Sequence, residues 1–182
     1  MSSNKIHPRP RQAPTETRFW RNRSGATAIE FSFLILPFLV LVFSIIEVSL
    51  GFASGQLLAN GSEKVVRQIR TGQQTVVTDS WVKSEICKSL SLLSGSNCEN
   101  EIAIYLQSQT GFSAAASASQ ISFKADGSID TTGWGISAGG ASTIHTLKAV
   151  YPRPTMIDLI SLVAPNVQME FFYTSTWRNE PY

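Results

Sequence analysis

The sequence is poor in the residue types that carry most catalytic and metal chemistry. It has two histidines, His7 and His145, and two cysteines, Cys87 and Cys98, among 182 residues. Two cysteines with no histidine nearby cannot supply the four ligands of a structural zinc site, and their spacing is not the C-x-x-C of redox proteins. No G-x-S-x-G, P-loop or H-E-x-x-H string occurs, and we expect His145 to be an ordinary sheet-facing or solvent-facing residue. The sequence therefore indicates no enzyme activity, no metal and no cofactor.

Charge is also missing from one long stretch. Sixteen consecutive residues between Glu30 and Glu47 carry no charge, in the string FSFLILPFLVLVFSII. At about 1.5 Å per helical residue these span roughly 24 Å, and the flanking residues extend the helix to the ~30 Å core of a bilayer. Pro37 removes one backbone donor, a loss that helices tolerate better in lipid than in water. We therefore expect one transmembrane helix over residues 26–53.

The charges on the two sides of this helix differ in sign. Residues 1–25 hold six basic residues and one acid, whereas the rest of the chain holds nine basic and twelve acidic residues. A basic tail can bind nucleic acid, but this one runs directly into the apolar segment and carries no nucleic-acid-binding motif. The positive-inside rule explains it better and places a basic leader, residues 1–25, in the cytoplasm. We expect residues 1–17, which are polar and rich in proline, to be disordered, and we expect no nucleic-acid partner.

Residues 54–182 predict a small extracytoplasmic domain of the α+β class. Apolar residues at helical spacing extend the membrane helix to about Gly72, and Thr78 or Asp79 could cap a second helix that ends near Gly95. Later segments are rich in β-branched and aromatic residues and predict an antiparallel sheet, with glycine- and serine-rich loops between them. A short helical turn fits within the proline-bracketed residues 152–166. The expected strands cover 102–107, 121–125, 143–151 and 167–177.

Both cysteines lie on the outer side of the membrane helix. In an oxidising compartment a disulfide between Cys87 and Cys98 is favoured over two buried thiols, and its contribution to stability is about 2–4 kcal/mol. The spacer between them contains glycine and serine and closes a loop of this length without strain. We expect this bridge to join the second helix to the strand that follows.

The most informative string is RSGATAIEF, residues 23–31, in which a basic leader ends in Gly25 and an acid, Glu30, lies alone in an apolar helix. A charge within a membrane span is unfavourable and usually marks function. This G-x-x-x-x-E-F string resembles the processing site of type IV pilin-like proteins. The helix that follows, the two cysteines, the Tyr-Pro-x-Pro element at 151–154 and the ending WRNEP at 177–181 resemble the TadE-like (TadE/TadF) pseudopilins of the tight-adherence (Flp) pilus system.

The resemblance implies a processing event and an assembly helix. A prepilin peptidase would cut between Gly25 and Ala26, because glycine lets the backbone approach the protease closely. Glu30 would become the fifth residue, followed by Phe31, and its carboxylate would pair with an N-terminal amine. The family motif at the C-terminus would be Arg178, Asn179, Glu180 and Pro181.

The resemblance also implies partners and a location. The protein would act as a minor pilin or pseudopilin that helps to assemble, initiate or cap a pilus. Its partners would be membrane lipid, the prepilin peptidase, the major Flp pilin, sister pseudopilins and the pilus assembly platform. It would lie in the inner membrane with a cytoplasmic N-terminus and a periplasmic domain, and a place in the pilus itself stays open.

Several alternatives remain at this stage. Glu30 could be an interfacial acid that reaches into the lipid headgroups, and Glu47 is best explained by ordinary solvation near the outer interface. The chain could also be a secreted binding domain behind a signal peptide cut near Phe52–Gly55, although the apolar run exceeds the usual length of a signal peptide. An uncleaved membrane anchor with a scaffold domain is the third possibility. Arg178 and Glu180 could tie the C-terminus back onto the domain through a surface ion pair that contributes about 0–1 kcal/mol.

Overall fold

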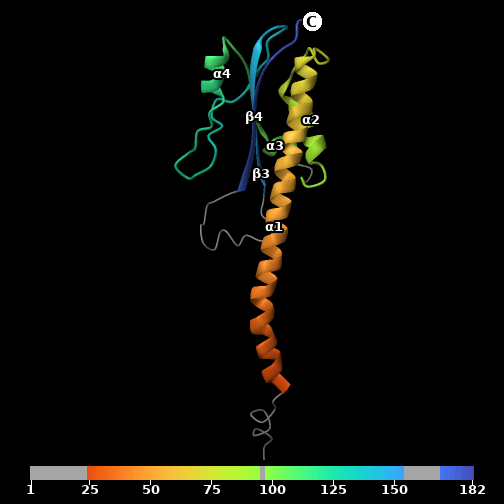
Figure 1. Ribbon diagram of the computed structural model, residues 1–182, viewed down its shortest axis with the longest axis vertical. Helices are drawn as coiled ribbons and strands as arrows, with labels where there is room; N and C mark the ends of the chain where they lie inside the picture. Colours follow the sequence, from red (N-terminus) through yellow and green to blue (C-terminus); the bar gives the residue numbers. More distant parts are fainter. Residues whose placement is uncertain (1–23, 95–96, 154–168) are drawn as a thin grey trace, which may run out of the picture. The chain divides into compact units, whose positions relative to one another are not determined.

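The computed structural model describes residues 24–94, 97–153 and 169–182. Contacts divide the chain into two units, Met1–Val42 and Phe43–Tyr182, and the second contains the folded domain. Figure 1 shows a long helix, shorter helices and a sheet, so the expected α+β class is confirmed. The elements in chain order are α1 (Ser24–Arg70), α2 (Asp79–Leu90), α3 (Cys98–Glu101), β1 (Ala103–Gln109), α4 (Phe112–Ala118), β2 (Ile136–Ser137), β3 (Ile144–Arg153) and β4 (Met169–Arg178).

The apolar segment and its amphipathic continuation form one helix, α1, with Pro37 inside it. Its end at Arg70 agrees with the expected end near Gly72. Gly72 has φ +70°, a conformation in which glycine meets no steric penalty and which commonly ends helices. The N–H groups of Thr71 and Gly72 donate to the carbonyl oxygens of Arg67 and Ile69, which satisfies acceptors that the helix end would leave unpaired.

The second helix, α2, begins where the sequence predicts. The Thr78 side chain is its N-cap and accepts a hydrogen bond from the Trp81 N–H at 3.3 Å. Val82, Ile86 and Leu90, at the helical spacing noted in the sequence, are all 0% exposed. Gly95, the expected end of this helix, lies outside the described residues.

The sheet has the order β2-β1-β3-β4, so β4 is an edge strand. β3 pairs antiparallel with β1 and with β4, as expected, whereas the two-residue β2 pairs parallel with β1. The sheet is therefore mixed, and the expectation of a purely antiparallel sheet was wrong in this respect. The parallel pairing arises because β2 is reached through a long connection that crosses back along β1.

Two local predictions were wrong. Residues 121–125 form no strand, and only Phe123 bridges Ile129 there. Asp126 and Asp130 instead accept hydrogen bonds from the N–H groups two residues later, and such turns favour a loop over a ladder. One of the glycine- and serine-rich segments expected to be loops, residues 111–120, contains α4, whose sequence FSAAASA is rich in alanine, the best helix former. The turn expected within 152–166 falls mostly on residues outside the described ranges.

Each face of the sheet is covered by different elements (Figure 1). α1 and α2 pack on one face, where the core contains Leu58, Val65 and Ile69 of α1 beside Leu106 and Leu147 of the strands. α4 contacts β1 and β3 from the other face. The central strand β3 is consequently buried on both sides over most of its length.

Candidate functional site

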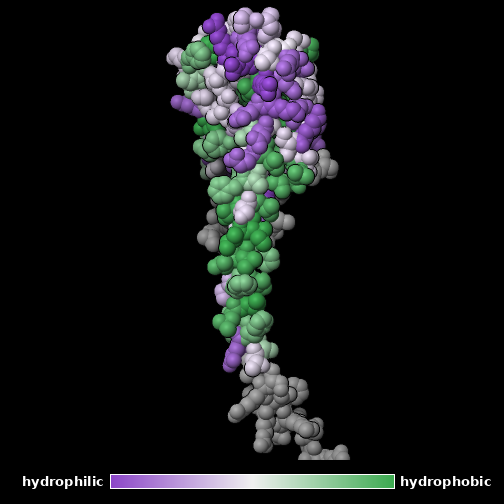
Figure 2. All heavy atoms as spheres, turned by 45° about the vertical axis from the view of Figure 1, so that its right-hand side comes forward, coloured by the Kyte–Doolittle hydropathy of each residue, from purple (hydrophilic) through white to green (hydrophobic). Residues whose placement is uncertain are grey.

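The apolar part of α1 carries a continuous exposed hydrophobic surface. It is long and apolar enough to cross a membrane, with a mean hydropathy of 2.6 over its most apolar window. Its large side chains are exposed all around the helix, for example Phe33 at 76% and Leu34 at 73%, and Figure 2 shows the apolar side chains along it. A helix that is apolar on every side requires lipid or other helices around it. This surface is the first candidate functional site.

The residues of the expected processing site lie at the start of α1. Gly25 is exposed, and a Cβ built on it would meet no atom within 4 Å. Glu30 is exposed one turn after Ala26, and Phe31 is 63% exposed. The backbone of 24–26 is helical in this structure, so a protease that binds extended substrate would have to unwind the first turn. The leader before Ser24, with its arginines, lies outside the described residues.

Glu47 is not simply solvated, which corrects the expectation for it. Its Oε1 lies 3.4 Å from Nη1 of Arg153 at the end of β3, and the two side chains are only 13% and 7% exposed. An ion pair removed from water needs its partner, because either charge alone would be buried without compensation. This contact therefore joins the end of the apolar stretch of α1 to the sheet.

Cys87 of α2 and Cys98 of α3 form a disulfide, with a Cα–Cα distance of 5.9 Å. The pairing agrees with the expectation from the sequence, but Cys98 begins α3 and does not lie in the strand that follows, so the expected helix-to-strand link was wrong. Both cysteines belong to the core cluster, so the bridge joins the two helices from inside the domain.

A second buried charge joins α1 to α2. The Glu85 carboxylate, 9% exposed, lies 2.7 Å from the Nζ atoms of both Lys64 and Lys88. Hydrogen bonds from Lys64 and then Lys88 lower the pKa of Glu85 below its usual value. The helices also approach closely at Gly61, where a Cβ would lie 3.0 Å from the Ile86 carbonyl oxygen.

The C-terminal motif ties the last strand to the domain through several separate contacts. Arg178 Nε donates to the Ser142 carbonyl oxygen at 3.0 Å. The Glu180 N–H donates to the Arg70 carbonyl oxygen at 2.9 Å, and the Glu180 carboxylate lies 3.4 Å from Arg70 Nε. The partner of Glu180 is thus the last residue of α1. Pro181 is exposed.

Asn179 is the buried centre of this motif, at 3% exposure. Its Oδ1 accepts a hydrogen bond from Trp177 Nε1 at 2.8 Å, and its Nδ2 donates to the Gly140 carbonyl oxygen and to the Tyr182 hydroxyl. The ring of Tyr182 covers Gly72, where a Cβ would come within 2.6 Å of it. One side chain therefore connects the last strand, the loop before β3 and the chain end that covers the end of α1.

His145 is fully buried, so the expectation of a sheet-facing residue holds and that of a solvent-facing one does not. Its Nε2 accepts a hydrogen bond from the Gly139 N–H at 2.7 Å, and its ring stacks on Trp177. Burial lowers the pKa of His145. The Thr143 hydroxyl also lies 3.5 Å from both ring nitrogens, and together these contacts explain the histidine by packing.

Lys148 is another buried cation, 7% exposed, and sequence inspection did not single it out. Its Nζ lies 4.4 Å from the ring centre of Tyr105 and 4.8 Å from that of Trp134, and it donates to the Gln120 carbonyl oxygen. Cation–π contacts of this kind stabilise a desolvated ammonium. They hold the loop after α4 against the sheet.

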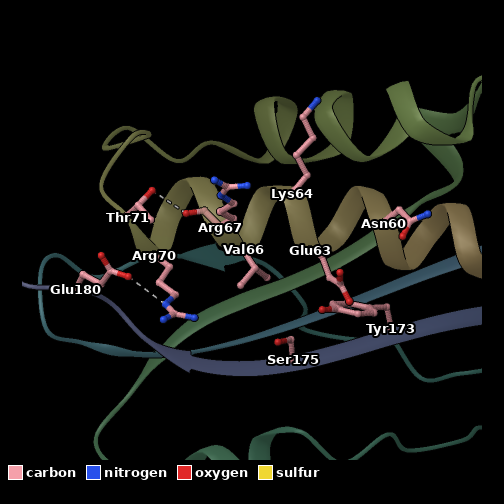
Figure 3. Close-up of a pocket in the computed structure, with 10 residues that line it drawn as sticks. All are labelled: Asn60, Glu63, Lys64, Val66, Arg67, Arg70, Thr71, Tyr173, Ser175 and Glu180. Atoms are coloured by element: carbon pink, nitrogen blue, oxygen red, sulfur yellow. Dashed lines mark hydrogen bonds and ion pairs between the residues drawn. The ribbon is translucent and has the colours of Figure 1, made fainter.

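A cleft of about 750 Å³ lies between α1 and β4 (Figure 3). Glu63, Arg67 and Arg70 line it from α1, and Tyr173 and Ser175 line it from β4. Burial and then the nearby carboxylate of Glu63 raise the pKa of Tyr173. No sequence pattern pointed to this cleft, because its two walls lie about a hundred residues apart in the chain.

Within residues 24–94, 97–153 and 169–182, no group of three histidine, cysteine, aspartate or glutamate side chains is arranged to hold a metal ion. The helix surface, the C-terminal motif and the cleft therefore stand as the candidate sites of this part of the chain.

Comparison with known proteins identifies one of these regions. Residues 25–67 match the family model described as TadE-like protein. Searches of curated proteins and of solved structures gave no match. The matched segment begins at the glycine of the expected processing site and ends in the last turn of α1. This match agrees with the resemblance seen in the sequence, and it covers residues 25–67, so the similarity to TadE-like proteins is shown for this segment.

Proposed function

We propose that this protein is a minor pilin or pseudopilin that serves in the assembly, initiation or capping of a Flp-type pilus. The observation that carries the proposal is the family match over residues 25–67, which covers the glycine, the acid and the exposed apolar helix together. The role is one of assembly rather than catalysis. In this role the helix supplies the surface that contacts other pilin helices, and the domain supplies specificity for the partner protein.

Processing after Gly25 would create the assembly-competent end. A prepilin peptidase cuts between Gly25 and Ala26 and exposes the amine of Ala26, which places Glu30 at the fifth position. The Glu30 carboxylate then pairs with an N-terminal amine. Pairing neutralises two charges that are each unfavourable in lipid, so it favours packing of one processed helix against another.

The exposed side chains of α1 support this view of assembly. Before assembly they contact membrane lipid, with residues 26–53 as the span, the leader 1–25 in the cytoplasm and the domain 54–182 in the periplasm. During assembly the same surface packs against helices of the major Flp pilin or of sister pseudopilins, at the assembly platform. A domain of this size argues for a minor component, because one large head at a tip or base obstructs packing less than a head on every subunit.

The N-terminus of the protein from its native host tests the processing step. Mass spectrometry of the intact protein should find a chain that begins at Ala26. A chain that begins at Met1 would indicate an uncleaved anchor, and one that begins near Gln56 would indicate a secreted domain; either result would overturn the proposal.

Replacement of Glu30 tests the assembly step. Glu30→Ala should insert into the membrane and be cleaved normally but lose pilus formation, because the amine has no counter-charge. A matched control is Glu63→Ala, which removes an acid from the same helix beyond the apolar segment. Normal piliation by the Glu30→Ala protein would count against the assigned role of this carboxylate.

A further inference from the structure

One wall of the cleft between α1 and β4 is formed by an edge strand of the sheet. β4 pairs with β3 on one side only, and no other described strand pairs with it. Alternate backbone N–H and C=O groups of an edge strand face outward without a partner in the sheet. Figure 3 shows Tyr173 and Ser175 of this strand opposite the polar face of α1.

β4 lacks the devices by which edge strands usually resist pairing. Its sequence, MEFFYTSTWR, contains no proline and no lysine, and residues 171–177 carry no charge. Its two charged side chains lie near its ends and contact the chain itself. Glu170 accepts a hydrogen bond from the Ile129 N–H, and Arg178 donates to Ser142. Edge strands normally carry central charges, proline or a bulge, and β4 has none of these, which favours the addition of a strand to it.

The helix wall offers a cation, Arg67, that no carboxylate in the described part of the chain neutralises. Lys64 pairs with Glu85, and Arg70 pairs with Glu180. For Arg67, in contrast, no carboxylate among the described residues lies within ion-pair distance. Glu63, one turn earlier, is the only acid of α1 that lines the cleft. Glu180 also lines the cleft and already pairs with Arg70, so Arg67 is the lining cation suited to a carboxylate from outside the described residues.

From these features we propose that the cleft binds an extended peptide segment of a partner protein, which adds as a strand to the free edge of β4. A carboxylate of the peptide, from an acidic side chain or a C-terminus, contacts Arg67. Main-chain hydrogen bonds to β4 would provide affinity, and the arginine would set the register. The site lies apart from the processing site and from the apolar stretch, so it does not depend on the proposed role in pilus assembly.

Binding of a defined peptide tests the proposal. The probe is a short fluorescent peptide of alternating threonine and valine that ends in a glutamate, titrated against the full-length chain in nonionic detergent and followed by anisotropy. Saturable binding should weaken at least about tenfold in the Arg67→Glu protein, as expected when a charge-assisted hydrogen bond is lost. Lys124→Glu, which makes the same charge change on an exposed loop, should leave the affinity unchanged.

Two altered peptides separate strand addition from simple charge attraction. Methylation of alternate backbone nitrogens keeps the charge but removes donors that a new strand needs, so it should abolish binding. Replacing the terminal glutamate with an uncharged amide should weaken binding to the native protein and remove the effect of Arg67→Glu. The proposal fails if the methylated peptide binds as well as the parent, if a lysine-ended peptide binds equally, or if no saturable binding occurs.

Discussion

The N–H of Glu180 donates a hydrogen bond to the carbonyl oxygen of Arg70, so the end of the chain is joined to the end of the long helix. The carboxylate of Glu180 also lies 3.4 Å from the guanidinium of the same arginine. Both side chains are about half exposed, and such an ion pair contributes only about 0–1 kcal/mol. The backbone bond and the buried contacts of the neighbouring Asn179 are therefore the stronger part of the connection.

Replacing Asn179 with alanine should destabilise the domain by about 1–3 kcal/mol, because the Trp177 N–H and the Gly140 carbonyl oxygen would lose their buried partner. Thermal unfolding in detergent, followed by tryptophan fluorescence, measures the effect. The matched control is Arg178→Ala, whose exposed side chain donates a hydrogen bond to the Ser142 carbonyl oxygen and whose loss should destabilise the domain less. Equal losses in the two variants would contradict the central position of Asn179.

Replacing Gly72 with alanine should destabilise the domain by more than the same change at Gly127. Both glycines have positive φ, which costs an alanine about 1–2 kcal/mol. At Gly127 a Cβ meets no atom within 4 Å, whereas at Gly72 it meets the Tyr182 ring at 2.6 Å. Thermal unfolding of both variants gives the comparison.

The steric part of the Gly72 effect has its own control. In the double variant Gly72→Ala/Tyr182→Ala the clash is removed and only the backbone strain remains. Tyr182→Ala should therefore destabilise the Gly72→Ala protein less than it destabilises the native protein. Additive losses would show that Tyr182 does not pack on Gly72 in solution.

Glu47 and Arg153 should be strongly coupled. Removal of one partner leaves a buried charge, which typically costs about 3–5 kcal/mol, so Arg153→Met or Glu47→Gln alone should destabilise the domain. The double variant should recover much of this loss, because neither charge remains. A double-mutant cycle on thermal unfolding measures the coupling, and a value near zero would show that the pair does not join α1 to β3.

Stability should fall as the pH drops below about 6.5 because of His145. Burial lowers the pKa of His145 from its ordinary value of 6.5, so the folded protein keeps the ring neutral while the unfolded chain takes up a proton. The stability that neutral His145 contributes is fully present above a pH of about 6.5. It is lost as the pH falls from there toward the lower pKa of His145 in the folded protein. Protonation of Nε2 would also break its hydrogen bond from Gly139.

The pH dependence of unfolding separates His145 from the carboxylates. His145→Gln should flatten the stability profile at pH values below about 6.5. The lowered pKa of Glu85 acts in a different window, since its contribution is lost only as the pH falls below about 4.5. An unchanged slope just below a pH of about 6.5 in the His145→Gln protein would contradict this assignment.

Much of the local structure could be predicted from the sequence. The second helix was placed correctly because its cap, Thr78, and its apolar residues lie within a few turns of one another. The predictions at 111–125 failed for the opposite reason. Short serine- and alanine-rich segments have weak preferences, and contacts of α4 with β1 and β3 select the helix there.

The sequence by itself determined the membrane-length helix, its acid at Glu30 and the resemblance to TadE-like proteins, because hydropathy, length and motif spacing are properties of consecutive residues. Only the tertiary structure decided that Glu47 meets Arg153, that Glu180 meets Arg70 and that α1 and β4 enclose a cleft. Each of these contacts joins residues about a hundred positions apart. Such pairs are brought together by strand register and by the packing of α1 on the sheet, and no pattern of neighbouring residues encodes either one alone.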